Sequence, residues 1–389
     1  MKKEKTLLSW MVSVALAAGL LAGCRKDLAT TDAAESAIQK KVSTEAVNTA
    51  QTVSLEKGVL YYPKGQSANT NSKTLMIDDA YDLGAYAHML TAAEKRGLGN
   101  NVRLKLKVYP QYAQTEPFGH FYYVKTKATD TIGSITAASL KSIYYDKRVL
   151  MSIYILPYLS IGWGPVTANT SPTPYEIDIS PFASALRDPD STVWIVSTMG
   201  QPATPDGKAT YKMDVDLYSD GSTDNTTWLY NYVKRIYSNM PGPSGWPTIT
   251  STITQSFVLE ADITNPVIRI NSTYDEGGFT ENVLTIDNAS TYNFSTRMTC
   301  TPNSYYANRN PSVTASTYEL WNYPTRNYCQ GAEVTPRMVA LSGTLKKGTH
   351  TLKLDMSKGY ETAWTNPPGV SASTSQKPRQ VGISIIGKR

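Results

Sequence analysis

Histidine and cysteine are scarce in this chain of 389 residues, which contains three of each. The histidines, His88, His120 and His350, are scattered, and no HExxH motif or other metal-ligand spacing connects them. The GxSxG motif that carries a nucleophilic serine in many hydrolases is also missing. These absences argue against a zinc or copper centre and against a serine hydrolase of that type.

Long amphipathic helices and runs of basic residues are missing as well. One stretch, residues 88–96, has a weak helical pattern that ends at Gly97. Without helices that alternate with strands, a βαβ fold is disfavoured. The chain has 38 basic and 32 acidic residues and a net charge of +6, with no basic stripe, so nothing favours nucleic acid as a partner.

The one long hydrophobic run lies at the N-terminus. Residues 7–20 (LLSWMVSVALAAGL) follow three lysines, and this run of 14 residues is too short for a stable membrane span but typical of an export signal. It ends in Leu21-Ala22-Gly23-Cys24, which resembles the lipobox of bacterial lipoproteins. We therefore expect residues 1–23 to be removed, Cys24 to carry a lipid, and the exported protein to be anchored to the bacterial outer membrane.

Export has consequences for charge and for the remaining cysteines. Loss of residues 1–23, with three lysines and one glutamate, lowers the net charge from +6 to about +4. Residues 24–50 are polar and predict a flexible tether. With Cys24 lipidated, Cys300 and Cys329 form an even pair in an oxidising compartment, which predicts a disulfide. Closing this loop of roughly thirty residues would contribute about 3–4 kcal/mol to stability.

From residue 51 onward, the hydrophobic pattern predicts strands almost everywhere. Residues 103–108 (RLKLKV) alternate strictly between charged or polar and apolar side chains. Further strands are expected at 148–156, 192–199, 210–218, 255–263, 267–271, 283–287, 292–299, 337–343, 350–356 and 381–386. Breaks in composition at 219–226 and 241–248 separate two halves. We expect an all-β protein with one sandwich domain over 51–225, a connecting segment over 226–247, and a second domain over 248–389.

Aromatic residues are unevenly used. The chain has 26 tyrosines and 7 tryptophans but only 6 phenylalanines. Tyrosine and tryptophan combine an apolar face with a polar edge, which suits stacking on sugar rings. Exported β-sandwiches also favour tyrosine for structural reasons, so this usage agrees both with a glycan partner and with a structural role.

Two groups of segments resemble the bacterial peptide-N-glycosidase F family, over about residues 100 to 360. Those that resemble the family's first domain are YILPY (154–158), YEIDISPFASAL (175–186), TVWIVSTM (192–199) and KMDVDLY (212–218). Those that resemble its second domain are YDEGGFTENVLTIDN (274–288), RMTCTPNSYYANRN (297–310) and NYCQGAEVTPRMVAL (327–341). The resemblance implies two jelly-roll sandwiches side by side, with a glycan site at their junction. It also implies hydrolysis of the amide between asparagine and the first N-acetylglucosamine of an N-glycan, with no metal or cofactor.

The resemblance assigns roles to residues of the second half. Glu276 matches the glutamate that the family's second domain supplies to the active site, although Asp-Glu-Gly-Gly alone reads as an ordinary turn between two strands. Tyr328 matches a substrate-facing aromatic residue, and Arg326 is close to a family arginine in the same loop. Glu276 is thus a candidate catalytic residue, and Tyr328 and Arg326 are candidate substrate-binding residues.

The first half departs from the family pattern at two acids. Pro117 stands where the family has its principal aspartate, so that only Glu116 beside it could serve, and Thr198 replaces a third acid. We therefore expect a lipid-anchored, monomeric protein that hydrolyses N-glycans of glycoproteins with Glu276 and Glu116. The alternatives are a glycan-binding protein without catalysis and a structural or protein-interaction module.

Overall fold

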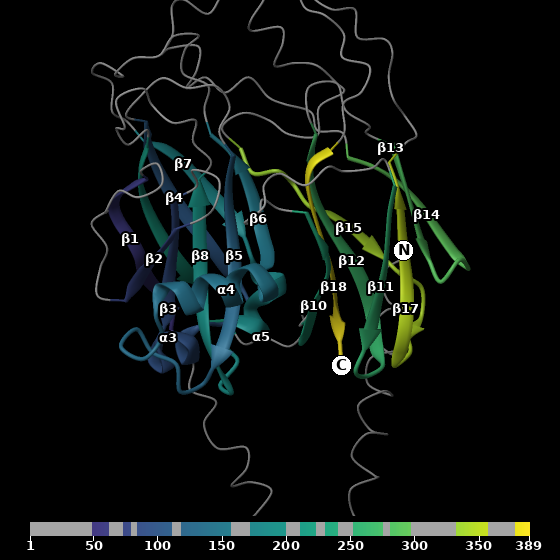
Figure 1. The fold of residues 1–389 in the computed structure, drawn as a ribbon, viewed down its shortest axis with the longest axis horizontal. Helices are drawn as coiled ribbons and strands as arrows, with labels where there is room; N and C mark the ends of the chain where they lie inside the picture. Colours follow the sequence, from purple (N-terminus) through teal and green to yellow (C-terminus); the bar gives the residue numbers. More distant parts are fainter. Residues whose placement is uncertain are drawn as a thin grey trace, which may run out of the picture. The chain divides into compact units, whose positions relative to one another are not determined.

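The computed structural model of this chain describes residues 49–61, 73–78, 84–110, 118–156, 172–199, 211–222, 230–239, 252–274, 281–296, 332–356 and 378–389. The chain divides into two compact units, Met1–Val47 and Asn48–Arg389, and every described residue belongs to the second unit. Antiparallel strands make up most of the described residues (Figure 1). The expectation of an all-β protein is confirmed.

Nine strands of the first half form a sandwich of two sheets. They are β1 (Gln51–Tyr61), β2 (Thr74–Asp78), β3 (Gly84–Leu90), β4 (Val102–Pro110), β5 (Phe118–Lys127), β6 (Val149–Ile155), β7 (Thr173–Asp178), β8 (Ser191–Met199) and β9 (Tyr211–Ser219). One sheet has the order β1-β9-β4-β7 and the other β2-β3-β8-β5-β6. When β2 is left out, the eight remaining strands pair from the outermost in the chain to the innermost: β1 with β9, β3 with β8, β4 with β7, and β5 with β6. This nesting defines a jelly roll.

The second half forms a sandwich with the same nested pairing. Its strands are β10 (Tyr232–Ser238), β11 (Thr252–Leu259), β12 (Ile263–Tyr274), β13 (Glu281–Ile286), β14 (Ser290–Ser295), β15 (Arg337–Ala340), β16 (Thr344–Leu345), β17 (Gly348–Asp355) and β18 (Pro378–Lys388). One sheet has the order β10-β18-β12-β15, with β16 also on β12, and the other β11-β17-β13-β14. The two jelly rolls that the sequence led us to expect are therefore present. β12 and β13 lie in different sheets and do not pair with each other, and residues 275–280 between them, with Glu276, lie outside the described residues.

Alternating burial shows why these segments form strands. In β9, every second residue from Tyr211 to Leu217 is buried, and in β4 the buried residues include Leu104, Leu106 and Val108. Strands β6 and β8 are buried along their whole length because both faces of their sheet are covered. A half-buried strand needs period-two alternation, whereas a doubly covered strand reads as a continuous apolar run.

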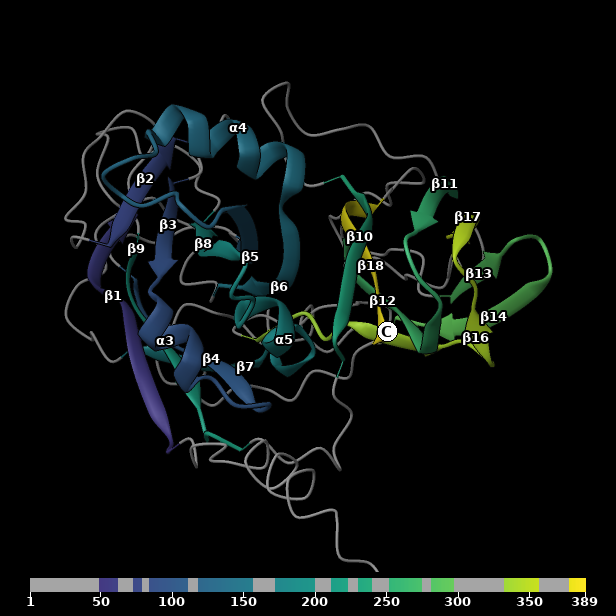
Figure 2. The ribbon, with the colours of Figure 1, turned by 90° about the horizontal axis from the view of Figure 1, so that it is seen from below.

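The outer face of the β2-β3-β8-β5-β6 sheet is covered in part by a helix that the sequence did not reveal. Helix α4 (Ala137–Lys147) crosses this sheet (Figure 2) and buries Leu140 and Tyr144 against it. The Tyr144 ring packs edge-on against Tyr122 of β5, with a centroid distance of 5.4 Å. Two buried side chains in 11 residues give little periodicity, which explains why the pattern predicted no helix here.

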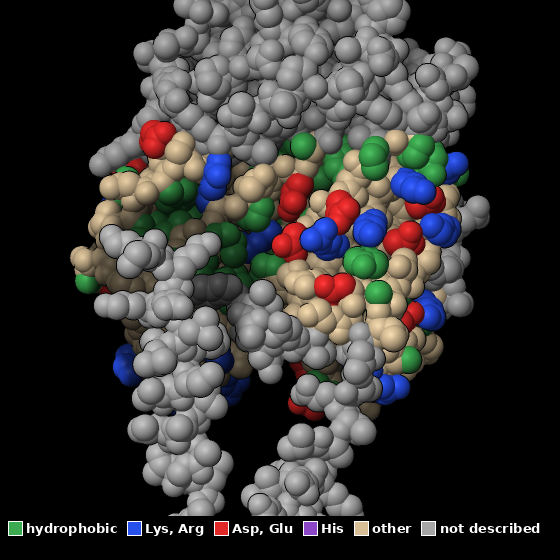
Figure 3. All heavy atoms as spheres, turned by 180° about the vertical axis from the view of Figure 1, so that it is seen from behind, with side chains coloured by type: hydrophobic (Ala, Val, Ile, Leu, Met, Phe, Trp, Pro, Cys, Tyr) green, Lys and Arg blue, Asp and Glu red, His purple; other side chains and the backbone are tan. Residues whose placement is uncertain are grey.

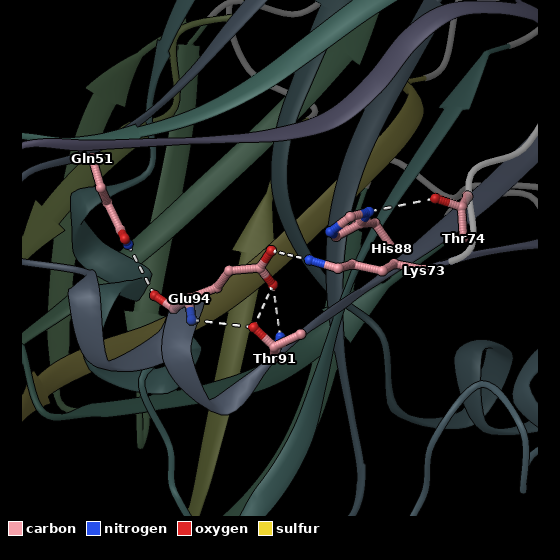
Figure 4. A network of polar contacts seen from close by, with 6 residues as sticks. All are labelled: Gln51, Lys73, Thr74, His88, Thr91 and Glu94. Carbon is pink, nitrogen blue, oxygen red and sulfur yellow. Dashed lines mark hydrogen bonds and ion pairs between the residues drawn. The ribbon is translucent and has the colours of Figure 1, made fainter.

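The helix expected over residues 88–96 is only half right. His88 lies in β3, and the helix α3 spans Ala92–Gly97. It begins after Thr91, whose Oγ1 accepts from the Glu94 N–H at 3.2 Å, while Glu94 accepts from the Thr91 N–H at 2.8 Å (Figure 4). This capping box fixes the helix start. Gly97 does not follow the helix as its cap; a Cβ there would overlap the Gln51 amide, so close approach explains this glycine.

Two short helical segments, η1 (Ser180–Phe182) and α5 (Ala183–Leu186), complete the described structure of the first sandwich. The outer face of its β1-β9-β4-β7 sheet is charged, and Figure 3 shows basic and acidic side chains interspersed there. Lys57 pairs with Asp216 at 3.4 Å, and Arg103 pairs with Glu176. Neighbouring charges of both signs are typical of a solvated face, not of a surface for a polyanion.

Candidate active site

The first sandwich brings the start of β5 beside the end of β8. Gly119 pairs with Met199, and His120 pairs with Thr198. A Cβ on Gly119 would overlap the Tyr154 ring of β6, so glycine leaves room for this ring beside β5.

The second sandwich brings the end of β12 beside the start of β18. Thr273 pairs with Gln380, and Tyr274 pairs with Pro378. The candidate acid Glu276 lies two residues after Tyr274, the last residue of β12. The candidate acid Glu116 lies two residues before Phe118, the first residue of β5. Each candidate acid thus flanks a strand end that the structure describes.

One side-chain network joins these two sets of strand ends. His120 Nε2 lies 2.7 Å from Gln380 Oε1, and His120 Nδ1 lies 3.0 Å from Thr198 Oγ1. Because an amide oxygen can only accept, this orientation of Gln380 requires that the ring donates from Nε2 and accepts the Thr198 hydroxyl at Nδ1. All three side chains are buried. The strand starts and ends that flank Glu116 and Glu276 are therefore connected across the two sandwiches.

The electrostatics of His120 favour a neutral ring. Burial lowers its pKa to about 4, the charge of Arg148 acts in the same direction, and the hydrogen bond to Gln380 opposes them. At neutral pH, both ring nitrogens are committed to the contacts above. His120 is thus suited to hold Gln380 in place, not to exchange protons with a substrate.

A row of buried polar side chains continues from Gln380 along β12. Gln380 Nε2, Thr273 Oγ1 and both amide atoms of Asn271 have no hydrogen-bond partner among the described residues. Asn271 and Thr273 share one face of β12, and Thr273 pairs with Gln380 on the neighbouring strand. Buried polar atoms are normally satisfied, so this row offers donors and acceptors beside the His120–Gln380 hydrogen bond.

The same face of β12 anchors the second sandwich to the first. Arg269 is buried, and its guanidinium donates to the main-chain carbonyls of Leu150 (3.4 Å) and Met151, at the bulge in β6. It also lies over the Phe182 ring, 5.0 Å from the centroid. Gly382 of β18 comes so close to Leu150 that a Cβ would overlap that side chain. The junction is therefore a close-packed contact between the two sandwiches.

Glu333 is a junction carboxylate that sequence reasoning did not single out. Residues 332–334 bond to the edge of β6, and Glu333 accepts a 2.9 Å hydrogen bond from the Ser152 hydroxyl. Burial raises its pKa to about 7, while the Ser152 bond and the charge of Arg269 act to lower it. A perturbed carboxyl group at a junction is a common feature of functional sites. In the sequence, the segment GAEVTP carries no signal apart from its resemblance to the family.

The residues predicted from the sequence lie outside the described residues. This applies to the candidate catalytic acids Glu116 and Glu276, to the candidate substrate-binding residues Tyr328 and Arg326, to the lipid site Cys24, and to Cys300 and Cys329. Their placement remains a prediction. Thr198, which the sequence resemblance sets at the position of a third acid, is described and is buried against His120.

The part of the chain that the structure describes contains neither a metal-binding cluster nor a membrane-spanning helix. No group of three histidine, cysteine, aspartate or glutamate residues there could hold a metal ion. No helix in these ranges is long and apolar enough to cross a membrane.

The topology and the junction can be compared with known proteins. No family model matches this chain, and a search of curated proteins found no significant match. Solved structures do match. The chain superimposes on the structure of PNGF-II with a TM-score of 0.58 and 14% identity, over 87% of this chain and 65% of that one. It superimposes on PNGase F, described as a glycosylasparaginase from Flavobacterium meningosepticum, with a TM-score of 0.52 and 14% identity, over 87% and 96% of the two chains.

This is a PNGase F-like fold. The shared topology includes both sandwiches, because the match extends over most of this chain and nearly all of PNGase F. At 14% identity the likeness concerns the fold, and the chain spans about two thirds of the length of PNGF-II. What the site does must be argued from the residues of this chain.

Proposed function

We propose that this protein acts on N-linked glycans of glycoproteins and hydrolyses the amide bond between asparagine and the first N-acetylglucosamine. In this reaction, water adds to the amide carbonyl carbon, the carbon–nitrogen bond breaks, and a proton goes to the departing glycosylamine nitrogen. The asparagine becomes an aspartate. The reaction needs an activated water molecule and stabilisation of the charge that develops on the carbonyl oxygen.

Glu116 and Glu276 are the residues proposed to carry this reaction. Glu116 would take the proton from water, and Glu276 would hold the amide and the first sugar. Tyr328 and Arg326 would contact the glycan. The observation that supports this assignment is the His120–Gln380 hydrogen bond of 2.7 Å, because it joins the strand end that flanks Glu116 to the one that flanks Glu276.

The proposal includes the setting of the enzyme. Cys24 would carry the lipid that anchors the exported, monomeric protein to the outer membrane, and Cys300 and Cys329 would form a disulfide. These features rest on the sequence pattern described above.

Glycan binding without cleavage is the second candidate function. One observation favours it: Thr198, at the position of a family acid, is buried and already hydrogen-bonded to His120. No carboxylate can act from that position. A binding protein would use the same junction but would leave the amide intact.

The experiment that separates these functions is glycan release from a denatured N-glycoprotein by the full chain. Hydrolysis predicts free glycan together with conversion of the glycosylated asparagine to aspartate, both detected by mass spectrometry. Glu276→Gln and Glu116→Gln should each lose most turnover while they remain folded and bind glycopeptide. Glu260→Gln is the matched control, because Glu260 pairs with Lys234 elsewhere in the second sandwich. Binding without any release would support the second candidate, and neither binding nor release would exclude both.

A further inference from the structure

A polar cleft lies on the boundary between the sandwiches, at the C-terminal end of α4. It has a volume of about 360 Å³ and is lined by residues that include Tyr145, Arg148, Arg235, Tyr237 and Gln255. Tyr145 and Arg148 come from the end of α4 and its cap, whereas Arg235 and Tyr237 lie on β10 and Gln255 lies on β11. The volume is within the usual range of small-molecule sites, roughly 300–1,000 Å³.

Two guanidinium groups dominate the charge of this cleft. Burial lowers the pKa of Arg235, and the nearby positive charge of Arg148 lowers it further, while Asp146 has the opposite effect. Asp146 does not line the cleft, and no described lining residue is acidic. A half-enclosed site with two positive charges attracts an anion more strongly than the open surface does, because the screening by solvent is weaker there.

Arg235 retains hydrogen-bonding capacity for a ligand. Its guanidinium donates to the carbonyls of Arg148 (3.1 Å) and Asp146, which lie at the C-terminal end of α4. A guanidinium has five N–H groups in a planar fork, so the remaining groups can bind a carboxylate or a similar oxyanion. Since the two carbonyls hold the side chain in place, little entropy is lost when a ligand binds.

Arg148 is a rigid element of the same wall. It is buried, and its guanidinium lies over the rings of Tyr122, Tyr144 and Tyr145 at 4.7–5.1 Å from their centroids. These contacts fix a positive charge behind the cleft. Tyr145 also lines the cleft and is half-buried, as is Tyr237 on the opposite side.

We propose that this cleft binds an acidic saccharide, with Arg235 on the carboxylate and the tyrosines and Gln255 on the sugar ring. Tyrosine rings at a polar cleft suit the apolar faces of sugars, and an amide side chain suits their hydroxyl groups. The assignment is independent of amide hydrolysis. It adds a second binding site to the candidate active site and stands whether or not the protein cleaves glycans.

The test is ligand-observed NMR with the full chain at constant ionic strength. The ligands are glucuronic, galacturonic and sialic acids at millimolar concentration, with glucose, galactose and acetate as comparisons. We expect at least one of the three acids to bind more tightly than both neutral sugars and than acetate. Binding of none of the three acids would overturn the proposal. Equal binding of acetate would assign the cleft to a free anion and would overturn the saccharide assignment.

Three variants locate the binding. Gln255→Glu places a negative charge of nearly the same shape in the cleft, and we expect it to weaken binding by about tenfold or more. Arg235→Gln should have a similar effect. Lys234→Gln removes the same charge from the adjacent residue of β10, whose side chain pairs with Glu260, and should leave binding unchanged. Equal losses of affinity in Lys234→Gln and Arg235→Gln would mean that only overall charge matters. Unchanged affinity in Gln255→Glu would place the ligand elsewhere. Either result overturns the proposal.

Discussion

The two sandwiches share one topology but present the same sheet to different surroundings. Strands β9 and β18 are equivalent. Each is the last strand of its jelly roll and pairs with the first strand of that jelly roll. The outward residues of β9 include Lys212, Asp214 and Asp216, which are partly exposed. At the equivalent positions, β18 has small or uncharged residues, Gln380, Gly382 and Ser384. What covers a sheet, and not the topology, decides the composition of its outer face.

Arginines on equivalent strands sharpen this comparison. Arg103 lies on β4 and Arg269 on β12, and each is the third strand of its jelly roll when β2 is left out. Arg103 pairs with Glu176 in a contact where both side chains are about half exposed. Arg269 is buried and bonds to main-chain carbonyls of the other sandwich. The same residue type therefore forms a surface ion pair in one sandwich and an anchor in the other.

The largest expected effect is the loss of this anchor. Arg269→Ala should lower the free energy of unfolding by about 3–5 kcal/mol, because it leaves two carbonyl groups of β6 unpaired and removes the positive charge near Glu333. Arg103→Ala is the matched control and should change it by less than about 1 kcal/mol. Urea denaturation of both variants measures the difference. Similar losses in the two variants would contradict the distinction between anchor and surface pair.

The sandwiches also differ in the surroundings of their acids, and one acid of the first sandwich is completely buried. Glu56 lies in the core of the first sandwich, where the hydroxyl groups of Tyr61 (2.8 Å) and Ser197 donate to its carboxyl oxygens. Burial raises its pKa to about 7, while these hydrogen bonds oppose the shift. The stabilisation from Glu56 is fully present below its unfolded pKa of about 4.5 and is lost as the pH rises through 7.

Glu56→Gln should remove this pH dependence. Relative to the wild type, the variant should gain about 3 kcal/mol of unfolding free energy between pH 4 and pH 8. The difference between the two proteins is the quantity to follow by urea denaturation, because Glu333, His88 and His120 titrate in the same range in both proteins. A difference that does not change with pH would mean that Glu56 is ionised in the folded state.

The sequence predicted the strands well because alternation reports burial on one face directly. Residues 103–108 and 210–218 alternate and form β4 and β9, and the doubly covered run 192–199 forms β8. The helix α4 was missed because its contacts with the sheet involve few of its residues. The start of α3 was misplaced by four residues, since the capping box at Thr91 depends on one hydrogen-bond pair and not on a periodic pattern.

The candidate site was less accessible to sequence reasoning. His120 was considered only as a metal ligand, and nothing in its neighbourhood along the chain indicates Gln380, which is 260 residues away. Glu333 has no pattern that distinguishes it from a loop acid. Its partners, Ser152 and Arg269, come from distant strands. Contacts between two sandwiches depend on how their sheets pack, which a periodic pattern within one strand does not encode.

The next effect is steric. Gly382→Ala should destabilise the protein by about 1–3 kcal/mol, because the added Cβ would overlap the Leu150 side chain on β6. Gly343→Ala is a control for backbone strain. No atom lies near its Cβ position, but its φ of +74° disfavours alanine. Its loss of unfolding free energy should be smaller and should come from backbone strain alone. Leu150→Ala shortens the side chain that the new Cβ would overlap. In the Leu150→Ala background, Gly382→Ala should therefore cost less unfolding free energy than it does in the wild type. Purely additive losses would show that Gly382 and Leu150 are not in contact.

The smallest expected effect concerns an acid of the second sandwich whose pKa moves in the opposite direction from that of Glu56. Glu260 is largely exposed, and its hydrogen bond with Lys234, together with a 2.7 Å bond from Tyr232, lowers its pKa to about 2. The stabilisation from Glu260 is therefore present above pH 4.5 and is lost as the pH falls through 2. Since the pair is exposed, Glu260→Gln should cost less than about 1 kcal/mol at pH 7, and this difference should vanish near pH 2. Urea denaturation between pH 7 and pH 2 checks both the size and the direction. If the free-energy difference between the wild type and Glu260→Gln grew as the pH falls, the ion pair would be contradicted. The contrast with Glu56, whose stabilisation is lost as the pH rises, would then disappear.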